Sequence, residues 1–499
     1  MVNQMFLHSS PQSSQSGRPW GYLLSLLFNA SCLVIIGKLL SKGSNSDSFQ
    51  GLGWSRKAAE EAEAAAQYTC SGHGYVFVDT FQDGTLNCEC NWCYMGPNCS
   101  QIDPDCVSDA DSGDPGILEP FWIANAEVGA TVVPAWYRMS YQINDGRQSV
   151  VSPELEKQIR AIHALVGNAV TQGRYIVLGT GSTQLINAAV NSLSPTHASN
   201  PAQVVAATPF YNGYRVSTEL FDSGDNLWRG DARAFREGTK SLNSTTFIEF
   251  VTSPNNPDTL LDEAVLKDEN VKTVYDHAYY WPHFTAISRP ADEDIMLFTL
   301  SKLTGHAGSR LGWAIIKDYD VYQKIYQYVK INTGGVSHDT QLRATTLLKA
   351  VIGGYRHPKR MEAIDRESKQ MIFHYAYSVM RWRWERLERI FNMSDRFSLQ
   401  NVGPLYCNFF RKVTGPSPAY AWVKCEREEE DCAAVLEKAG IIGRRAEEFG
   451  ADKRYVRLSL LRRDDAFAVL EHRLQALVCY NNHCEDIFSS NQPNSWPQF

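Results

Sequence analysis

Lys302 is the residue whose type and position most clearly suggest chemistry. It follows Ile295 to Leu300 (IMLFTL), a short apolar run with β-branched and aromatic content that predicts a buried strand. The lysine then enters a turn that contains Gly305, Gly308 and Gly312. An amine at the end of a buried strand is partly desolvated, which favours its neutral, nucleophilic form. Such an amine can form a Schiff base with an aldehyde.

Donor side chains crowd the same turn and indicate an anion site. They lie within SKLTGHAGSR and comprise Ser301, Thr304, His306, Ser309 and Arg310. The turn is unlike a P-loop, in which the lysine follows the glycines. Without these neighbours, Lys302 would be interpreted as a strand-ending lysine that points to solvent.

Two other turns that follow predicted strands carry polar residues. GTGSTQ, at 179–184, follows the strand-like run 175–178 and leads into an apolar helix through Leu193. Backbone amides at such a helix N-terminus form an anion site, although the same residues would cap any helix. Asp276, in VYDHAYYWPH, follows another strand-like run. Taken alone, Asp276 would also be interpreted as a helix cap.

The elements that position these turns form an α/β pattern. Strand-like runs alternate with helical stretches and comprise residues 175–178, 203–207, 247–251, 271–275 and 295–300. This alternation predicts a mostly parallel sheet with helices on both faces, in which sites gather at the carboxyl ends of the strands. Long helices are predicted at 318–331, 337–351 and 359–389. The remainder contains strand-like YCNFF, YAWVKC and YVRLSLL and predicts a smaller α+β domain.

Composition sets the broad class of the protein. The 499 residues are enough for a large core and more than one domain, and the net charge of −7 with a pI near 6.0 argues against nucleic acid as the main partner.

The chain before the cysteine block divides into three segments. Residues 1–19 are polar and predict disorder, and the composition of residues 41–69 predicts a linker. Between them, 20–40 form an apolar segment that predicts a signal anchor, with a cleaved signal peptide as the alternative.

Six cysteines cluster in one short segment: Cys70, Cys88, Cys90, Cys93, Cys99 and Cys106. Such clustering indicates a disulfide module in an oxidising compartment, which places the chain after the apolar segment in a lumenal or extracellular space. A metal site is the competing interpretation, because Cys90 and Cys93 form a CxxC pair, but a second matching pair is missing. In the small domain, Cys425 and Cys432 flank a charged loop and are predicted to pair, with two free cysteines as the alternative.

These motifs together resemble the alliinase and tryptophan-aminotransferase-related enzymes of plants. The similarity is carried by GTGSTQ, TSPNNPD, AYYWPH and SKLTGHAGSR, and extends from Asp114 to about Leu477. The cysteine block at 70–106 resembles the epidermal-growth-factor-like module of alliinases, whereas the region before Cys70 lies outside the strong resemblance. The resemblance implies a fold type I aminotransferase-like large domain at 107–390, with a mostly parallel sheet, and a small C-terminal α+β domain with a tail at 391–499.

The resemblance also implies pyridoxal 5'-phosphate as cofactor and a role for each matched residue. Lys302 would be the lysine that bonds the cofactor, and Asp276 would hold its pyridine nitrogen protonated. The other implied cofactor contacts are Tyr279 and Asn256 at the ring oxygen, Ser182, Thr183, Thr299 and Arg310 at the phosphate, and Tyr141 from the second subunit of a homodimer. Arg457, in YVRLSLL, would grip the substrate carboxylate. No metal ligand set is implied.

The implied reaction is transamination of an L-amino acid, with a keto acid as second substrate. An aromatic amino acid is expected because the motifs are closer to those of the tryptophan-aminotransferase-related enzymes, and this implies a link to auxin synthesis. The alternative is an alliinase-type carbon–sulfur lyase that cleaves S-alkyl cysteine sulfoxides by β-elimination. A third hypothesis is a membrane-tethered binding protein whose enzyme domain is inactive. The intact Lys302, Asp276 and Arg310 argue against this hypothesis.

The expected location is the lumenal side of a secretory-pathway membrane. Glycosylation sequons at Asn98, Asn243 and Asn392 would lie on that side, whereas the sequon at Asn29 lies inside the apolar segment.

Overall fold

A computed structural model describes residues 53–67, 70–79, 85–103, 105–143, 149–196, 199–220, 223–236, 245–356 and 371–482. Within these ranges, no helix combines the length and apolar character needed to cross a membrane. The predicted anchor at 20–40 lies outside them. The chain separates into two compact units, one of residues 1–69 and 76–87 and the other of residues 70–75 and 88–499.

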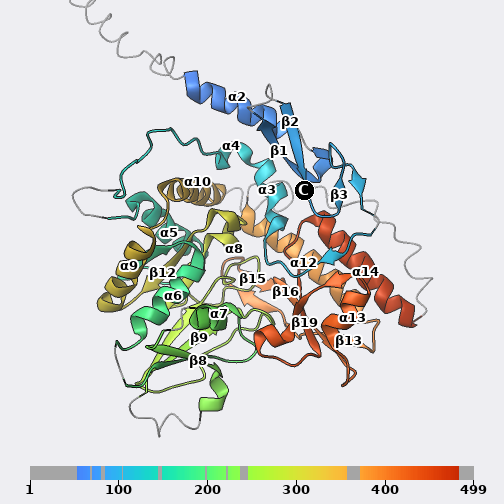
Figure 1. Cartoon of the computed structure of the whole chain (residues 1–499). Helices are drawn as coiled ribbons and strands as arrows, with labels where there is room; N and C mark the ends of the chain where they lie inside the picture. Colours follow the sequence, from blue (N-terminus) through green and yellow to red (C-terminus); the bar gives the residue numbers. More distant parts are fainter. Residues whose placement is uncertain are drawn as a thin grey trace, which may run out of the picture. The chain divides into compact units, whose positions relative to one another are not determined.

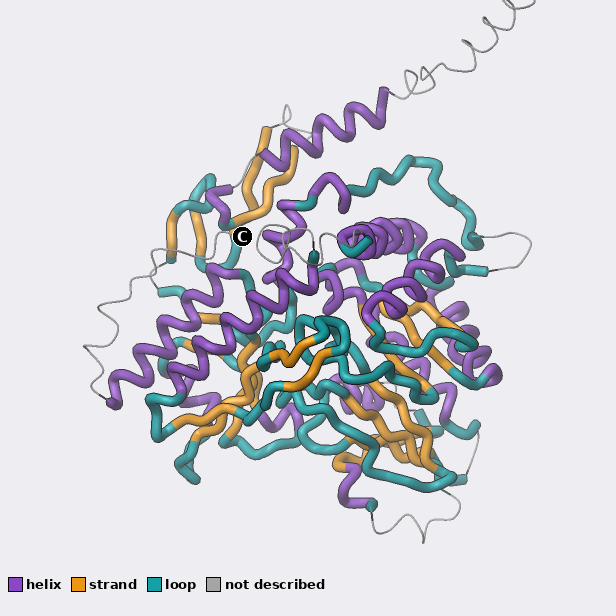
Figure 2. The backbone as a smooth tube through the Cα atoms, turned by 180° about the vertical axis from the view of Figure 1, so that it is seen from behind, coloured by secondary structure: helices purple, strands orange, loops and turns teal. Residues whose placement is uncertain are grey.

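A seven-stranded sheet forms the centre of the large domain (Figures 1 and 2). Its strands, in spatial order, are β6 (Tyr175–Gly179), β12 (Gly312–Ile316), β11 (Ile295–Thr299), β10 (Val271–Asp276), β9 (Phe247–Thr252), β7 (Ala202–Ala206) and β8 (Asn226–Asp231). β12 runs antiparallel to both neighbours, and the remaining pairs are parallel. The fold class is therefore confirmed. β8 and β12 were not predicted as strands, and Leu300 belongs to the following helix rather than to β11.

Helices cover both faces of this sheet, as the fully buried strand residues require. Within β11, Met296 and Phe298 belong to one apolar cluster, while Ile295 and Leu297 belong to a second on the opposite face. The main helices of this domain are α5 (Pro153–Val166), α6 (Gly181–Leu193), α7 (Gly213–Leu220), α9 (Tyr319–Thr333) and α10 (His338–Gly354). The predicted helices at 318–331 and 337–351 thus form, each ending two or three residues later than expected.

Strand register brings distant residues together at one edge of the sheet. Asp276 pairs with Thr252 across β10 and β9, and Gly312 pairs with both Thr299 and Gly179. Because the parallel strands end at this edge and β12 begins there, the turns that carry Asp276, Lys302 and the start of α6 all meet.

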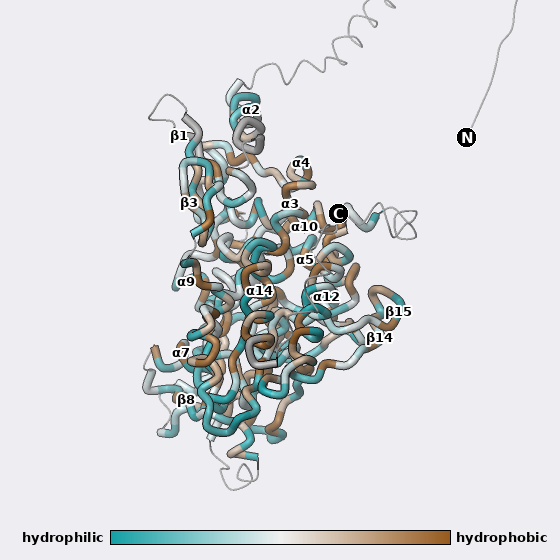
Figure 3. The backbone as a smooth tube through the Cα atoms, turned by 90° about the vertical axis from the view of Figure 1, so that its right-hand side faces the viewer, coloured by the Kyte–Doolittle hydropathy of each residue, from teal (hydrophilic) through white to brown (hydrophobic). Residues whose placement is uncertain are grey.

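The small domain has a four-stranded antiparallel sheet in the order β13 (Phe397–Leu399), β16 (Tyr420–Cys425), β19 (Tyr455–Ser459) and β18 (Arg444–Arg445). It is accompanied by α12 (Ile372–Phe391), α13 (Cys432–Lys438) and α14 (Asp464–Asn482). The first part of the helix predicted at 359–389 lies outside the described residues. A hairpin of β14 (Leu405–Cys407) and β15 (Lys412–Thr414) stands out at one edge, with exposed Tyr406 and Val413 (Figure 3). Cys425 and Cys432 form a disulfide, which confirms that prediction.

The cysteine block folds into short strands joined by three disulfides. The bridges join Cys70 to Cys88, Cys90 to Cys99 and Cys93 to Cys106. Both members of the CxxC pair are therefore bonded to other cysteines, which removes them as metal ligands. The strands are β1 (Gly74–Asp79) with β2 (Thr85–Cys90), and β3 (Tyr94–Met95) with β4 (Gln101–Ile102). The charged stretch before the block forms a helix, α2 (Gly53–Gln67).

Candidate active site

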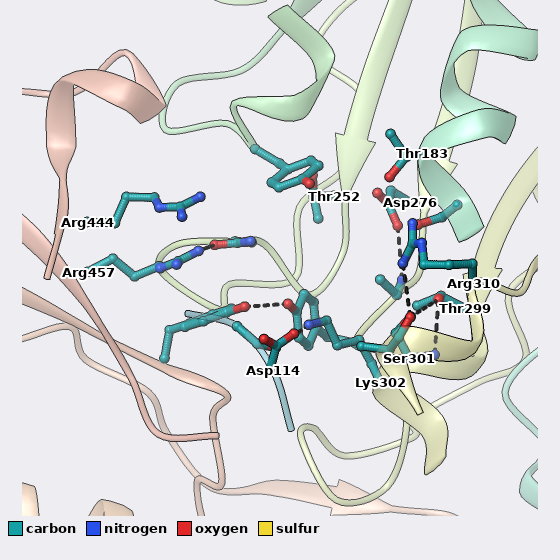
Figure 4. A pocket seen from close by; sticks show the side chains of 18 residues that line it. Asp114, Thr183, Thr252, Asp276, Thr299, Ser301, Lys302, Arg310, Arg444 and Arg457 are labelled. Carbon is teal, nitrogen blue, oxygen red and sulfur yellow. Dashed lines mark hydrogen bonds between the residues drawn. The ribbon is translucent and has the colours of Figure 1, made fainter. Parts of the chain in front are cut away.

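A pocket of about 220 Å³ lies where the carboxyl ends of β9, β10 and β11 meet the sheet of the small domain (Figure 4). Nine of the residues singled out from the sequence line it: Ser182, Thr183, Asn256, Asp276, Tyr279, Thr299, Lys302, Arg310 and Arg457. Tyr141 does not, since its side chain is 86% exposed on the surface of this chain. That position is compatible with a residue that would act on a second subunit.

Lys302 enters the pocket from a single helical turn, α8 (Leu300–Thr304), that directly follows β11. Leu300 and Leu303 are fully buried on the other side of this turn and orient the lysine toward the pocket. The side chain of Thr299 caps α8 by accepting a hydrogen bond from the Ser301 amide at 3.1 Å. The amine of Lys302 donates to the carbonyl oxygen of Gly113, which belongs to a segment that crosses the pocket.

Asp276 is a buried carboxylate at the end of β10. Its Oδ1 accepts from the Ala278 amide and its Oδ2 from the Tyr214 hydroxyl, both at 3.1 Å. Burial raises the pKa of Asp276 above its ordinary value, while these two hydrogen bonds and the nearby charge of Lys302 act in the opposite direction. A buried carboxylate with so few partners is well suited to receive a cationic group of a ligand.

An anion cradle forms at the end of the pocket near Asp276. The first turn of α6 has no side-chain cap at Thr180, so its amides remain directed toward the cradle together with the hydroxyls of Ser182 and Thr183. Arg310 lies on the same side (Figure 4). A side chain at Gly181, which has φ 73°, would collide with the Arg310 guanidinium.

Two arginines occupy the other end, on strands of the small domain. Arg457 is 2% exposed; it donates to Asn256 Oδ1 at 2.9 Å and to the Asp111 carbonyl oxygen at 2.5 Å, and its Nε has no hydrogen-bond partner among the described residues. Arg444 is instead bound by both carboxylate oxygens of Asp111, at 2.6 and 2.7 Å. The Asp111 carboxylate thus holds Arg444 through two short hydrogen bonds but lies 4.0 Å from Arg457 Nη2, so the charge of Arg457 is the less fully neutralised of the two, which favours it as the binder of a further carboxylate.

Several lining residues were not identified from the sequence: Gly113, Asp114, Tyr211, Thr252, Tyr420 and Arg444. Of the donors predicted in the turn around Lys302, Ser301 and Arg310 line the pocket, whereas Thr304, His306 and Ser309 do not. Arg444 lies directly opposite Arg457 in the pairing of β18 with β19, and Trp422 lies opposite Arg457 on the other side. Tyr420 is two residues from Trp422 on β16, so it shares that face. Nothing in the local sequence signals these positions, because they depend on which strands pair.

The lining residues fit a cofactor that combines an aldehyde, a phosphate and a basic ring nitrogen. The amine of Lys302 suits the aldehyde, the α6 cradle with Arg310 suits the phosphate, and buried Asp276 suits a protonated ring nitrogen. Gly181 keeps the cradle open, since a Cβ at this position would fill the place of the Arg310 side chain. These three features meet the demands of pyridoxal 5'-phosphate.

Fold and site define a pyridoxal-phosphate-dependent enzyme fold of type I. Among solved structures, the multiple substrate aminotransferase from Thermococcus profundus matches with a TM-score of 0.53 at 15% identity, over 76% of this chain and 91% of that one. The chain belongs to the alliinase family: the family model "Allinase" matches residues 108–478, and the model "Alliinase EGF-like domain" matches residues 53–106. The latter match begins before Cys70 and includes α2, so the resemblance extends further toward the N-terminus than expected.

Curated relatives come from both branches of this family. The chain is 49% identical to tryptophan aminotransferase-related protein 3 of Arabidopsis thaliana, over 85% of this chain and 91% of that protein. It is 44% identical to an alliin lyase of Allium cepa, over 90% of this chain and 92% of that protein.

Proposed function

We propose that this protein is a pyridoxal-phosphate-dependent aminotransferase that acts on an L-amino acid with an aromatic side chain. The observation that carries the proposal is the placement of Lys302 and Arg457 in one pocket. The large-domain side supplies an amine, and the small-domain side supplies a guanidinium whose Nε has no hydrogen-bond partner among the described residues. Three tyrosines, Tyr211, Tyr279 and Tyr420, supply aromatic surface between them. The name of the Arabidopsis relative supports the same reaction.

Each residue then has a defined task. Arg457 binds the substrate carboxylate and so fixes the α-carbon near Lys302, whose amine takes the α-proton. Asp276 keeps the proton on the cofactor's ring nitrogen, and Tyr279 with Asn256 holds the ring oxygen. When bound, the cofactor withdraws electrons from the α-carbon and so makes this proton acidic. Exchange of the amino group for a keto group completes the proposed reaction, and from tryptophan it gives an indole keto acid, consistent with a link to auxin synthesis.

Carbon–sulfur lyase activity is the second candidate, because the chain is also 44% identical to an alliin lyase over nearly its whole length. The same residues would remove the α-proton, after which a β-substituent leaves instead. Purified protein should be incubated with tryptophan and a keto acid, and separately with an S-alkyl cysteine sulfoxide. Formation of the indole keto acid supports the proposal. Release of pyruvate from the sulfoxide alone would replace it with the lyase, and no product from either substrate would favour an inactive binding protein.

Replacing Arg457 with lysine should raise the KM for the amino acid by roughly 10- to 100-fold with a smaller change in kcat. A charge-assisted hydrogen bond is worth about 1.5–3 kcal/mol, and a lysine cannot bind a carboxylate with two parallel bonds. Steady-state kinetics on both substrates measures this change. Arg444→Lys is the matched control and should raise KM less, because Asp111 already occupies the Arg444 guanidinium. An equal rise in both variants would contradict the role of Arg457.

We also propose that the catalytic domain is lumenal and that the 20–40 segment associates with a membrane. Four disulfides among the described residues support an oxidising compartment. Asn98 is exposed, and its Oδ1 accepts a hydrogen bond from Ser100 of the same sequon at 2.8 Å. Asn392 is exposed at the end of α12, and Asn243 lies outside the described residues.

Glycosidase treatment should therefore increase the electrophoretic mobility of protein isolated from plant cells, and carbonate washing should leave it with the membranes. Asn98→Gln and Asn392→Gln variants identify which sequon is used. A protein that changes mobility but washes off has lost its apolar segment by cleavage, which rejects the anchor and keeps the compartment. A protein that shows no mobility change and carries reduced cysteines at 70–106 would contradict the lumenal location.

A further inference from the structure

Tyr420 makes a hydrogen bond that the proposed reaction does not yet explain. Its side chain is 1% exposed at the start of β16, and its hydroxyl lies 2.5 Å from the hydroxyl of Tyr279. The two rings meet edge to face, with centroids 5.5 Å apart. Tyr279 follows β10 of the large domain, so the bond joins the two domains inside the pocket.

Tyr420 is also held close to the two groups that would bind cofactor and substrate. The guanidinium carbon of Arg457 lies 4.2 Å from the centroid of the Tyr420 ring. A Cβ at Gly113 would come within 2.5 Å of the Tyr420 hydroxyl and 3.3 Å of the Lys302 amine. The hydroxyl and the amine therefore both lie close to the backbone of Gly113. The absence of a side chain at Gly113 is what allows this approach.

The charges around the pair make the two phenols unequal. Burial by itself raises the pKa of Tyr420, but the positive charges of Lys302, Arg457 and Arg444 act in the opposite direction, and the pKa of Tyr420 lies below its ordinary value. Burial raises the pKa of Tyr279 well above its ordinary value, and the neighbouring Tyr420 adds to this rise. The ionisable groups facing Tyr420 are Tyr211, Tyr279, Lys302, Arg444 and Arg457. Tyr420 is thus the more acidic phenol and the stronger hydrogen-bond donor.

A phenol has a single proton, which limits what Tyr279 can do. If Tyr279 donates to the ring oxygen of the cofactor, its own oxygen can only accept, and Tyr420 is the hydroxyl within reach. We propose that Tyr420 is a positioning residue that donates to Tyr279 and thereby directs the Tyr279 proton to the cofactor's ring oxygen. The rearrangement needs only rotation of the two hydroxyls, and no covalent bond forms or breaks. The inference rests on the proposed function, since it assigns Tyr279 to the ring oxygen.

Tyr420→Phe tests this arrangement by removing one oxygen and retaining the ring that packs on Arg457. The readout is the pH titration of the visible absorption of the cofactor bound to the purified protein, measured without substrate. A donor to Tyr279 strengthens the bond from Tyr279 by cooperativity of about 10–30%. Its loss leaves negative charge on the ring oxygen less stabilised, so the titration midpoint should rise by roughly 0.1–0.7 of a pH unit. Tyr279→Phe should raise it more, by about one pH unit or more.

Two further variants separate positioning from a general structural effect. In the Tyr279→Phe background, Tyr420→Phe should add no shift, because the group through which it acts is gone. Tyr280→Phe is the matched control: it removes a buried hydroxyl that donates to the Arg289 carbonyl oxygen at 2.7 Å, outside the pocket, and should leave the midpoint unchanged. If Tyr420→Phe leaves the titration midpoint unchanged, or shifts it equally in the wild-type and Tyr279→Phe backgrounds, the inference is overturned while the proposed function stands. Wild-type protein that binds no cofactor would overturn the inference and the proposed function together.

Discussion

Lys302→Ala should abolish turnover and remove the visible absorption of the cofactor from purified protein. The amine of Lys302 is the only lysine amine that lines the described pocket, so no other lysine there can bond the aldehyde or take the α-proton. Loss of a general base alone costs about 10²- to 10⁴-fold in rate, and loss of the covalent link adds to it. The expected decrease in kcat is therefore at least about 10³-fold.

Lys317→Ala provides the matched control for this change. Lys317 directly follows β12 and pairs with Asp294 at 3.3 Å, away from the pocket. This variant should retain the visible absorption and the turnover of the wild type. Absorption spectra and steady-state rates of the two variants measured side by side make the comparison. Turnover near the wild-type rate in Lys302→Ala would refute the assignment of this lysine.

Asp276→Asn should lower kcat by roughly 10²- to 10⁴-fold while leaving the protein folded. Removing one partner of a buried ion pair costs about 3–5 kcal/mol, and each 1.36 kcal/mol is a factor of ten in rate. An amide has nearly the same size as the carboxylate, so the pocket keeps its shape. Single-turnover rates of amino-group removal from tryptophan, with the cofactor at saturation, measure the loss. Activity within a few-fold of the wild type would show that Asp276 does not hold the ring nitrogen.

The same substitution, which lowers kcat, should raise the stability of the cofactor-free protein. Because burial raises the pKa of Asp276 in the folded state, the stabilising contribution of this group is full below its unfolded pKa and is lost as the pH rises through the folded value. Asparagine carries no such titration. Cofactor-free Asp276→Asn should therefore gain thermal stability relative to the wild type between pH 4 and pH 7. Melting curves at both pH values measure this gain, and a constant difference between the two proteins would contradict it.

The sequence alone determined the local elements and the chemistry that they carry. Apolar runs such as 175–178 and 295–300 predicted the buried strands, and glycine-containing turns directly after them predicted Ser182, Thr183 and Lys302 as neighbours at one sheet edge. Such signals are local, because periodicity and turn chemistry act over a few residues. The charged loop between Cys425 and Cys432, together with the expected oxidising compartment, likewise predicted their disulfide.

Only the tertiary structure decided which distant residues complete the pocket. Arg444 and Tyr420 reach it because β18 and β16 flank β19 in one register, and a shift of one residue would turn both side chains to the opposite face. Gly113 lies at the Lys302 amine although 189 residues separate them. The run that forms β12 is apolar, but no local pattern indicated its antiparallel place between β6 and β11. Strand pairing depends on packing between segments far apart in the chain, and this information is absent from any short stretch of sequence.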